Sequence, residues 1–222
     1  MRIVVTGAGG TLGRAVLKAF ADRGDQVAAI VRRPATGLPD AVRQIAGGDL
    51  ADPASASSAL RDAASVLGDG IDALIHLVGS FEWSTVEQGR PETWRRLFGD
   101  NVETTLAAVQ AALPWIGDGG AILCVGAASA EPAAAGMGPY AAAKSGVARI
   151  VEALASELKP RGIRVNAILP SIIDTPRNRA DMPNVDPAGW ATPAAIADVV
   201  LFLAGAQTRA ISGALIPVTH NG

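Results

Sequence analysis

The sequence contains only one cysteine, Cys124, and only two histidines among its 222 residues. A single cysteine excludes any disulfide bond within the chain, which fits a reducing compartment. Cys124 lies in the apolar run AILCVG without a neighbouring base, so we interpret it as a core thiol and not as a nucleophile. Zinc sites take clusters of Cys and His ligands, so this composition predicts no metal site.

The sequence also lacks an excess of either charge and has no long hydrophobic run. Its net charge of −2 at pH 7 gives no electrostatic reason to expect nucleic acid or an anionic membrane as a partner. No apolar run approaches the ~20 residues that cross a bilayer. The N-terminal run in MRIVVTGAGG is broken by glycines too early for a signal peptide. We therefore expect a cytoplasmic protein whose partner is a small-molecule substrate.

What the sequence does contain is a regular alternation of short β-branched runs and longer alanine-rich stretches. Strands are expected at residues 2–6, 26–31, 71–77, 120–126, 163–169 and 213–218, with a short one near 43–46. Helices are expected at residues 11–23, 54–67, 92–116, 139–159 and 193–204. The pairs Asp52-Pro53 and Thr192-Pro193 mark two of the helix starts. This order predicts an α/β fold, a doubly wound parallel sheet of the Rossmann type, in a single domain spanning residues 1–222.

Residues 170–191, PSIIDTPRNRADMPNVDPAGWA, interrupt this alternation and are rich in Pro, Asp and Asn. So long a connection in a compact domain is usually functional or mobile. It follows the carboxyl end of an expected strand, where open α/β sheets bind ligands. We therefore interpret about 171–191 as a substrate lid, and a surface excursion without a role is the alternative.

The glycine-rich run TGAGGTLG, residues 6–13, directly follows the first expected strand and opens the first expected helix. Glycines at this point allow a tight turn and a close approach of the backbone to a pyrophosphate, and the helix N-terminus offers free N–H groups to phosphates. A P-loop is excluded because no Gly-Lys-Ser/Thr follows. The run therefore predicts a dinucleotide site that includes Gly7, Gly10, Thr11, Leu12 and Gly13.

The residues after the second and third strands bear on which dinucleotide binds. Many such folds end the second strand with an acid that bonds the ribose 2′-OH, whereas here Val31 is followed by Arg32 and Arg33. Because guanidinium groups bind phosphates well, we predict NADP(H) over NAD(H), and the alternative is that both arginines only face solvent. Asp49 and Leu50 stand where an adenine ring would lie. Asp49 is either an acceptor for the adenine amino group or a turn carboxylate.

Tyr140 and Lys144 lie four residues apart at the start of an expected helix, so both side chains leave the same helix face. An ammonium group near a phenol favours the phenolate, so we expect the pKa of Tyr140 to lie below its usual value of about 10. Such a phenol donates and accepts protons near neutral pH. The pair therefore predicts general acid–base chemistry.

With these residues the chain resembles the short-chain dehydrogenase/reductase family over essentially its full length. The resemblance rests on TGAGGTLG, Asp49-Leu50, Gly79 in HLVG, Asn101, YAAAK, and the stretch Asn166…Pro170…Thr175-Pro176. It implies that Tyr140 is the acid/base, that Lys144 lowers its pKa and bonds the nicotinamide ribose, and that Asn101 holds a water in a proton relay. It also implies that Gly79 and Thr175 belong to the cofactor site and that the subunits form a homodimer or homotetramer.

The chain departs from this family at the catalytic serine. That serine usually stands thirteen residues before the tyrosine, a position held by Ala127 here. Ser129 lies two residues further on and would be displaced by ~6–7 Å in an extended chain. His76 stands where the family has asparagine, and we interpret it as a structural residue.

Dihydropteridine reductases also keep the tyrosine and lysine and lack the serine, and the chain resembles them in GMGPYAAAK and DTPRNRADMPNVDPAGWATP. This likeness implies NAD(P)H-dependent reduction of a quinonoid or pterin-like substrate, with Trp83 and Trp190 either stacking a flat ring or packing around the pocket. One alternative is a carbonyl or alcohol reductase in which Ser129 supplies the missing hydroxyl. The other is a non-catalytic NADP(H)-binding sensor, which would have no need of Tyr140 and Lys144.

Overall fold

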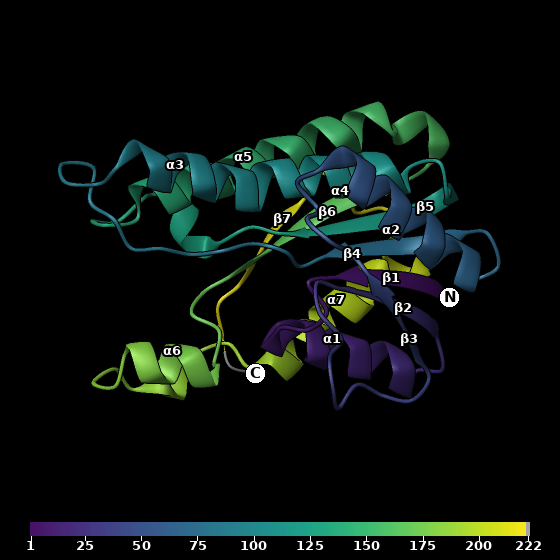
Figure 1. Cartoon of the computed structure of the whole chain (residues 1–222), viewed down its shortest axis with the longest axis horizontal. Coiled ribbons are helices and arrows are strands. Elements are labelled where there is room, and N and C mark those ends of the chain that lie inside the picture. The colour runs from purple at the N-terminus through teal and green to yellow at the C-terminus, as the bar shows by residue number, and fades with distance from the viewer. Residues whose placement is uncertain (221–222) are drawn as a thin grey trace.

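The computed structural model describes residues 1–220 and consists of one seven-stranded sheet between two layers of helices (Figure 1). The strands are β1 Arg2–Thr6, β2 Gln26–Val31, β3 Val42–Ala46, β4 Ile71–His76, β5 Ile116–Val125, β6 Arg164–Pro170 and β7 Leu215–Val218. All neighbouring strands pair in parallel, in the order β3-β2-β1-β4-β5-β6-β7. The strand order reverses between β1 and β4, and ligands of open α/β sheets bind at such a point. The predicted Rossmann-type fold is confirmed.

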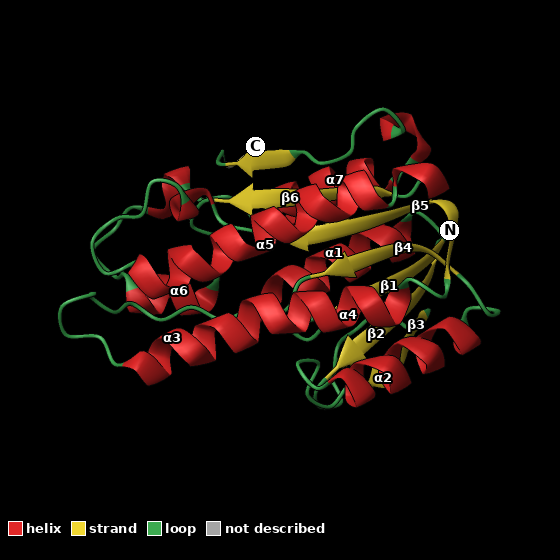
Figure 2. Cartoon of the chain, turned by 90° about the horizontal axis from the view of Figure 1, so that it is seen from above, coloured by secondary structure: helices red, strands yellow, loops and turns green. Residues whose placement is uncertain are grey.

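The helices cover both faces of the sheet. They are α1 Thr11–Asp22, α2 Pro53–Val66, α3 Pro91–Phe98, α4 Thr104–Ala112, α5 Gly138–Glu157, α6 Pro176–Asp181 and α7 Pro193–Ala204. Helices α2, α4 and α5 lie on one face, and α1 and α7 lie on the other (Figures 1 and 2). Strand residues such as Val4 and Ile122 belong to one core and Val5 and Leu123 to the other. Burial on both faces explains why the strands are almost continuously apolar.

Two helix starts carry the expected caps. The Asp52 carboxylate accepts a hydrogen bond from the Ser55 N–H at 2.8 Å, and the Thr192 hydroxyl accepts one from the Ala195 N–H at 3.1 Å. A proline directly follows each cap, where its missing N–H costs no hydrogen bond.

The single helix expected over residues 92–116 is wrong in two respects. It ends at Ala112, because Pro114 has no N–H to donate to the carbonyl of Gln110 and so interrupts the helical hydrogen bonds, and β5 begins at Ile116. A π-helical turn, Gly99–Glu103, also separates α3 from α4, with the Thr104 N–H bonded to the Gly99 carbonyl five residues back. Such turns are frequent at functional sites.

The segment expected to be a lid, residues 171–191, contains α6 and a short 3-10 turn, Pro187–Gly189. Its own polar side chains hold it together: Thr175 caps α6 by accepting from the Asn178 N–H at 3.1 Å, and the Asn178 amide donates to the Ile173 carbonyl at 2.8 Å. The Arg179 guanidinium bonds both oxygens of the Asp174 carboxylate. Much of the DTPRNR motif is therefore explained by local structure.

Within residues 1–220 no helix is both long and apolar enough to cross a bilayer. In the same part of the chain, no group of three or more His, Cys, Asp and Glu side chains is arranged to hold a metal ion. Cys124 is fully buried, and burial raises the pKa of its thiol to about 12. A thiol in that state is a poor nucleophile.

Candidate active site

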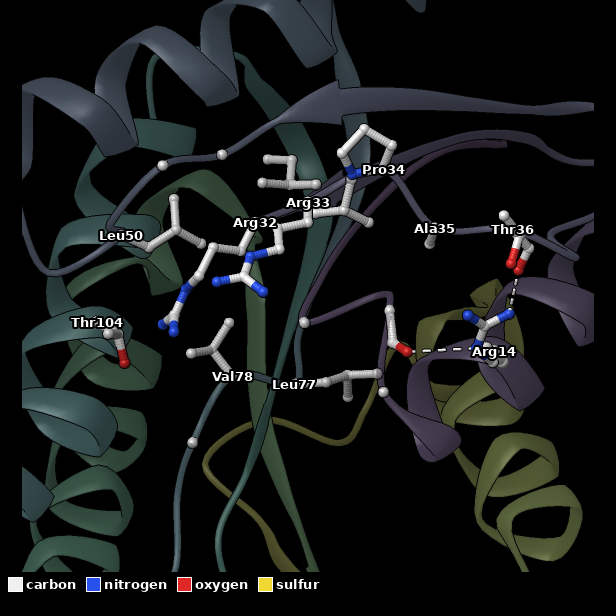
Figure 3. A pocket seen from close by; sticks show the side chains of 18 residues that line it. Arg14, Arg32, Arg33, Pro34, Ala35, Thr36, Leu50, Leu77, Val78 and Thr104 are labelled. Atoms are coloured by element: carbon white, nitrogen blue, oxygen red, sulfur yellow. Dashed lines mark hydrogen bonds between the residues drawn. The ribbon is translucent and has the colours of Figure 1, made fainter.

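A cavity of about 750 Å³ opens where β1, β2, β3 and β4 end (Figure 3). This volume falls in the range of small-molecule and cofactor sites. Its lining residues are Gly7, Gly9, Gly10, Arg14, Ile30, Val31, Arg32, Arg33, Pro34, Ala35, Thr36, Gly47, Gly48, Leu50, Leu77, Val78, Gly79 and Thr104. The cavity therefore lies at the point where the strand order reverses.

The glycine-rich turn forms one wall of the cavity, and its glycines are required by close approaches. Gly7 has a φ of +68°, and a Cβ there would lie 2.8 Å from the Leu77 carbonyl carbon. A Cβ at Gly13 would lie 2.6 Å from the Gly7 carbonyl oxygen, so Gly13 packs behind the turn. Thr11 and Leu12 form the first turn of α1 without lining the cavity. No side chain caps this helix start, which leaves its N–H groups available to an anion.

Three arginines line the cavity, and two of them are the predicted Arg32 and Arg33 (Figure 3). Neither makes an ion pair or a side-chain hydrogen bond with any residue of the described chain 1–220. The third, Arg14, donates to the carbonyls of Thr36 at 2.6 Å and Gly9 at 3.3 Å. Sequence reasoning missed Arg14, although its place directly after the glycine-rich run was a usable signal. The wall therefore carries concentrated positive charge without an acidic partner.

The two residues predicted to meet an adenine ring are placed differently. Leu50 is buried and lines the cavity. Asp49 is exposed, does not line the cavity, and accepts a hydrogen bond from the Ala51 N–H at 3.0 Å. Of the two interpretations of Asp49, the turn carboxylate matches this placement.

Asn101 lies in the π turn between α3 and α4 and is fully buried. Its amide nitrogen donates to the Leu97 carbonyl at 2.8 Å and to the Ser80 carbonyl at 3.1 Å. Its Oδ1 has no hydrogen-bond partner within residues 1–220. A buried acceptor left open is costly in a folded protein. The Oδ1 is therefore an unused acceptor for a water or a ligand.

Gly79 brings Asn101 and Lys144 to one point. A Cβ at Gly79 would lie 2.6 Å from Asn101 Oδ1 and 2.9 Å from Lys144 Nζ. The absence of a side chain at Gly79 leaves the acceptor and the ammonium group above the same small space. The structure thus brings together three of the predicted residues, from the loop after β4, the π turn and α5.

Tyr140 and Lys144 leave the same face of α5, as predicted, but the expected lowering of the Tyr140 pKa is wrong. Burial raises the pKa of Tyr140 to about 12. The Lys144 Nζ lies 6.0 Å from the centre of the Tyr140 ring and donates to the Val125 carbonyl at 2.9 Å. Burial also lowers the pKa of Lys144 to about 8. Desolvation therefore outweighs the attraction of the ammonium, and the phenol is protonated at neutral pH.

The remaining side chains that the sequence predicted for the site do not line the cavity. Ala127, the residue at which the sequence predicts the family's serine to be missing, is buried. Ser129 lies in a 3-10 turn, Ala128–Ala130, without a hydrogen bond from its hydroxyl within residues 1–220. Trp190 is 5% exposed and so packs inside the protein, whereas Trp83 is 62% exposed. Thr175 caps α6 and does not line the cavity.

Two residues near the site could not be predicted from the sequence, because only the tertiary structure brings them to the cavity or to Tyr140. Thr104 reaches the cavity wall through the π turn, for which the sequence carries no recognised signal. Phe81 lies edge-on against Tyr140, with ring centres 5.0 Å apart and planes at 89°. Phe81 is 52% exposed, so it borders both the phenol and the solvent.

His76 ends β4 and is 1% exposed, with its Nδ1 2.8 Å from the Thr6 hydroxyl. Its Nε2 has no hydrogen-bond partner in the described chain 1–220. Burial lowers the pKa of His76 to about 3, and the charge of Lys144 adds to that effect. The imidazole is therefore neutral in the folded protein, in agreement with a structural role.

This burial predicts a pH dependence of stability. In the unfolded chain the imidazole takes up a proton near pH 6.5, whereas in the folded chain it does so only near pH 3. The unfolded state binds more protons between these values, so the free energy of unfolding falls as the pH is lowered from 6.5 towards 3, by about 1.4 kcal/mol per unit. Urea unfolding of His76→Asn at several pH values should lose this slope between about pH 6.5 and 5.

The other histidine of the chain, the exposed His220, supplies the matched control. The variant His220→Asn should keep the slope of the wild type. A slope that persists unchanged in His76→Asn would show that another group titrates in this range.

Comparison with known proteins agrees with this geometry. A family model described as Enoyl-(Acyl carrier protein) reductase matches residues 7–220. An uncharacterized NAD-dependent oxidoreductase of Mycobacterium tuberculosis is 31% identical in an alignment of length 191, and the match covers 77% of this chain and 69% of the relative. A short-chain dehydrogenase/reductase structure from Serratia marcescens has a TM-score of 0.87 and 27% identity, covering 99% of this chain and 96% of the other. The 3-ketoacyl-(acyl-carrier-protein) reductase of Brucella melitensis, complexed with NADH, has a TM-score of 0.85 and 26% identity, covering 97% and 95%.

Proposed function

The chain belongs to the short-chain dehydrogenase/reductase family, and from that premise we propose that it is an oxidoreductase that uses a nicotinamide cofactor. The observation that carries this proposal is the placement of Tyr140 and Lys144 on one face of α5, with Lys144 Nζ and Asn101 Oδ1 meeting over Gly79. Gly79 also lines the cavity of about 750 Å³, so this cation and this open acceptor lie next to it. Together with the acid Tyr140 on the same helix as Lys144, they suit proton-coupled redox chemistry on a small substrate.

The residues present fit a dinucleotide. Gly7 and Gly13 let the glycine-rich turn fold tightly against Leu77 and the start of α1, where any Cβ would clash, and the uncapped start of α1, at Gly10, Thr11 and Leu12, offers N–H groups to a pyrophosphate. Leu50 offers an apolar surface to an adenine ring. We assign the nicotinamide end of the cofactor to Gly79, Lys144 and Thr175. A bound nicotinamide cofactor supplies or accepts the hydride.

The side chains of the protein donate the proton that accompanies the hydride and then replace it. Burial keeps Tyr140 in its phenol form at neutral pH, so Tyr140 donates a proton to the substrate when the substrate is reduced. Lys144 carries its charge below pH about 8 and is held in place by the Val125 carbonyl. Once Tyr140 has given up its proton, the Lys144 ammonium supplies one towards the phenolate, and a water held by the open Asn101 Oδ1 replaces the proton on Lys144. Oxidation in the reverse direction requires the phenolate, so it should become faster as the pH rises.

We propose that NADP(H) is preferred over NAD(H), although two of the similar proteins are named with NAD or NADH. The support is the set of Arg14, Arg32 and Arg33 around the cavity, together with the absence of an acid at Val31. A 2′-phosphate offers these guanidinium groups the acidic partner that they lack in the described structure.

We further propose a substrate that is already activated, such as a quinonoid or pterin-like ring, as in dihydropteridine reductases. Loss of one hydrogen-bond donor to the reacting oxygen costs about 10²–10³ in rate, and Ala127 supplies no such donor. A quinonoid ring depends less on that donor. The test is NADPH oxidation with quinonoid dihydropterin, a simple quinone and an aliphatic ketone, and we expect turnover in that order. Binding of NADPH without turnover across a broad acceptor panel would favour the sensor interpretation.

A carbonyl reductase that uses Ser129 is the rival proposal, and Ser129→Ala separates the two. Because the Ser129 hydroxyl lies in a turn beyond Ala127, we expect Ser129→Ala to lose far less activity than the ~10²-fold cost of a missing donor. Steady-state kcat/KM with the best acceptor measures this effect. A loss of a hundredfold would instead assign the missing hydroxyl to Ser129.

We also propose that residues 171–191 act as the substrate lid. The bridge between Ile173 and Ala191, with the Asp174 N–H bonded to the Ala191 carbonyl at 2.9 Å, ties the two ends of the segment together. α6 lies between these ends and is stiffened by its own caps. Such a segment can move as one unit, which is how lids exclude water from a reaction.

A further inference from the structure

Two neighbouring arginines on α3 differ in what they bind. Arg95 pairs with Glu92 on the same helix, and both side chains are about three-quarters exposed. Arg96 pairs with Asp100 in the π turn and with Glu82 in the loop after β4. Arg96 therefore links the helix to a loop, whereas Arg95 links the helix only to itself.

The partners of Arg96 are connected to Asn101 by hydrogen bonds. The Ser80 hydroxyl donates to the Asp100 carboxylate at 2.5 Å, and Arg96 Nη1 lies 3.2 Å from the same carboxylate oxygen. The Ser80 carbonyl in turn accepts a hydrogen bond from the Asn101 amide at 3.1 Å. The position of Ser80 therefore helps to orient the Asn101 amide, whose other end is the open acceptor of the site.

The partners of Arg96 also lead to Tyr140. Phe81 stands between Ser80 and Glu82. Ser80 is held by the Asp100 carboxylate that Arg96 binds, and Glu82 pairs with Arg96 directly. The Thr93 hydroxyl also donates to the Glu82 carboxylate at 3.1 Å. The Phe81 ring lies edge-on over Tyr140 with ring centres 5.0 Å apart. It shields one side of the phenol and leaves half of its own surface to solvent, beside the reacting group.

We propose that Arg96 is a positioning residue of the active site, and that Phe81, which it holds in place, is the wall against which a flat substrate ring lies. Arg96 acts through Glu82 and Asp100 on residues 80–82, and these set the Phe81 ring against Tyr140 and the Ser80 carbonyl against Asn101. This inference rests on the proposed roles of Tyr140 and Asn101. It adds to them the surface that recognises the substrate, because an exposed phenylalanine ring stacks with planar, aromatic molecules.

The effect of Arg96 should exceed that of an ordinary surface ion pair. Isolated exposed pairs contribute little to stability, but Arg96 joins two carboxylates and a hydroxyl in one network. Catalytic groups that are misplaced by about 1 Å lose as much as about 10²-fold in rate. A loosened loop at residues 80–82 would move the Phe81 ring away from Tyr140 and the Ser80 carbonyl away from the Asn101 amide.

The test compares Arg96→Gln with Arg95→Gln, its matched control, and with Arg96→Lys. Tyr140 is the only tyrosine in the chain, so the ultraviolet absorbance of tyrosinate after a pH jump titrates it directly in the cofactor-free protein. We expect Arg96→Gln to lower the Tyr140 pKa from about 12 towards its ordinary value of 10, because Phe81 no longer covers the phenol. Arg95→Gln should titrate like the wild type, and Arg96→Lys should restore part of the shift.

Steady-state kinetics supply the second readout. With a planar quinonoid acceptor, Arg96→Gln should lower kcat/KM by about tenfold or more. Phe81→Leu should raise KM for this acceptor by a larger factor than it raises KM for a small aliphatic ketone. Identical titrations and identical kcat/KM in Arg96→Gln and Arg95→Gln would overturn the proposal. If no acceptor is reduced by the wild type, the proposed function fails, and the tyrosinate titration still decides whether Arg96 positions Phe81 over Tyr140.

Discussion

Replacing Tyr140 with phenylalanine should lower kcat by about 10²–10⁴-fold, the range that a positioned general acid contributes. The phenyl ring remains, so its packing against Phe81 at 5.0 Å is kept and only the proton donor is lost. Cofactor affinity should change little, because Tyr140 does not line the cavity of about 750 Å³. Turnover with the best acceptor measures the first effect, and quenching of tryptophan fluorescence by NADPH measures the second.

The pH profile gives an independent check on this role. Because burial holds the Tyr140 pKa at about 12, the phenol persists through the neutral range and into mild alkali. The phenol form is present below its pKa and lost above it, so Tyr140 alone should cause no fall in the reduction rate between about pH 6 and 10. A variant Tyr140→Phe that keeps most of the wild-type kcat would show that the proton comes from another group.

Replacing Arg32 and Arg33 together with glutamine should raise the Kd for NADPH by about 10²-fold or more, because each charged hydrogen bond to a phosphate contributes about 1.5–3 kcal/mol. The Kd for NADH should change only slightly, since NADH has no 2′-phosphate. Both constants can be measured by fluorescence titration. Adding Val31→Asp to the double variant should improve NADH binding, because an acid at the end of β2 can bond the ribose 2′-OH.

Arg43→Gln is the matched control for this prediction. Arg43 is an exposed arginine on β3 that does not line the cavity, so its loss changes the net charge without changing the phosphate site. It should leave both constants near the wild-type values. Tighter binding of NADH than of NADPH by the wild type would refute the role of Arg32 and Arg33.

The fold was predictable because its signals are local. The spacing of β-branched runs placed β1 at residues 2–6 and β2 at residues 26–31, as the structure has them. The glycine-rich run was predictable for the same reason, since a turn between a strand and a helix is specified by neighbouring residues. Pro114 is also a local signal for the end of the helix at Ala112. The prediction placed the end at residue 116 because the alanine-rich pattern continues up to the proline.

The parts that sequence could not give depend on distant segments. Whether the Tyr140 pKa rises or falls depends on burial under Phe81 and on where Lys144 Nζ is held, and neither follows from a four-residue spacing. The link from Arg96 to Glu82 joins residues 14 apart in sequence through the fold of the loop after β4. Arg95 and Arg96 look equivalent in the sequence, and only tertiary structure distinguishes them.

The π turn at Gly99–Glu103 gives the helical rod of α3 and α4 a property that a uniform helix lacks. Each residue of an α-helix advances the chain by about 100°, so one extra residue in a turn shifts the phase of everything after it by that angle. Side chains on α3 and α4 that would lie on different faces of a regular helix can thereby come to share one stripe. Arg96 and Thr104 are eight residues apart and would lie about 80° apart on a regular helix, and the extra residue brings them to nearly the same stripe. One edge of the rod thus meets the loop after β4 with Arg96 and the cavity with Thr104, and the number of residues between them is itself part of the design of the site.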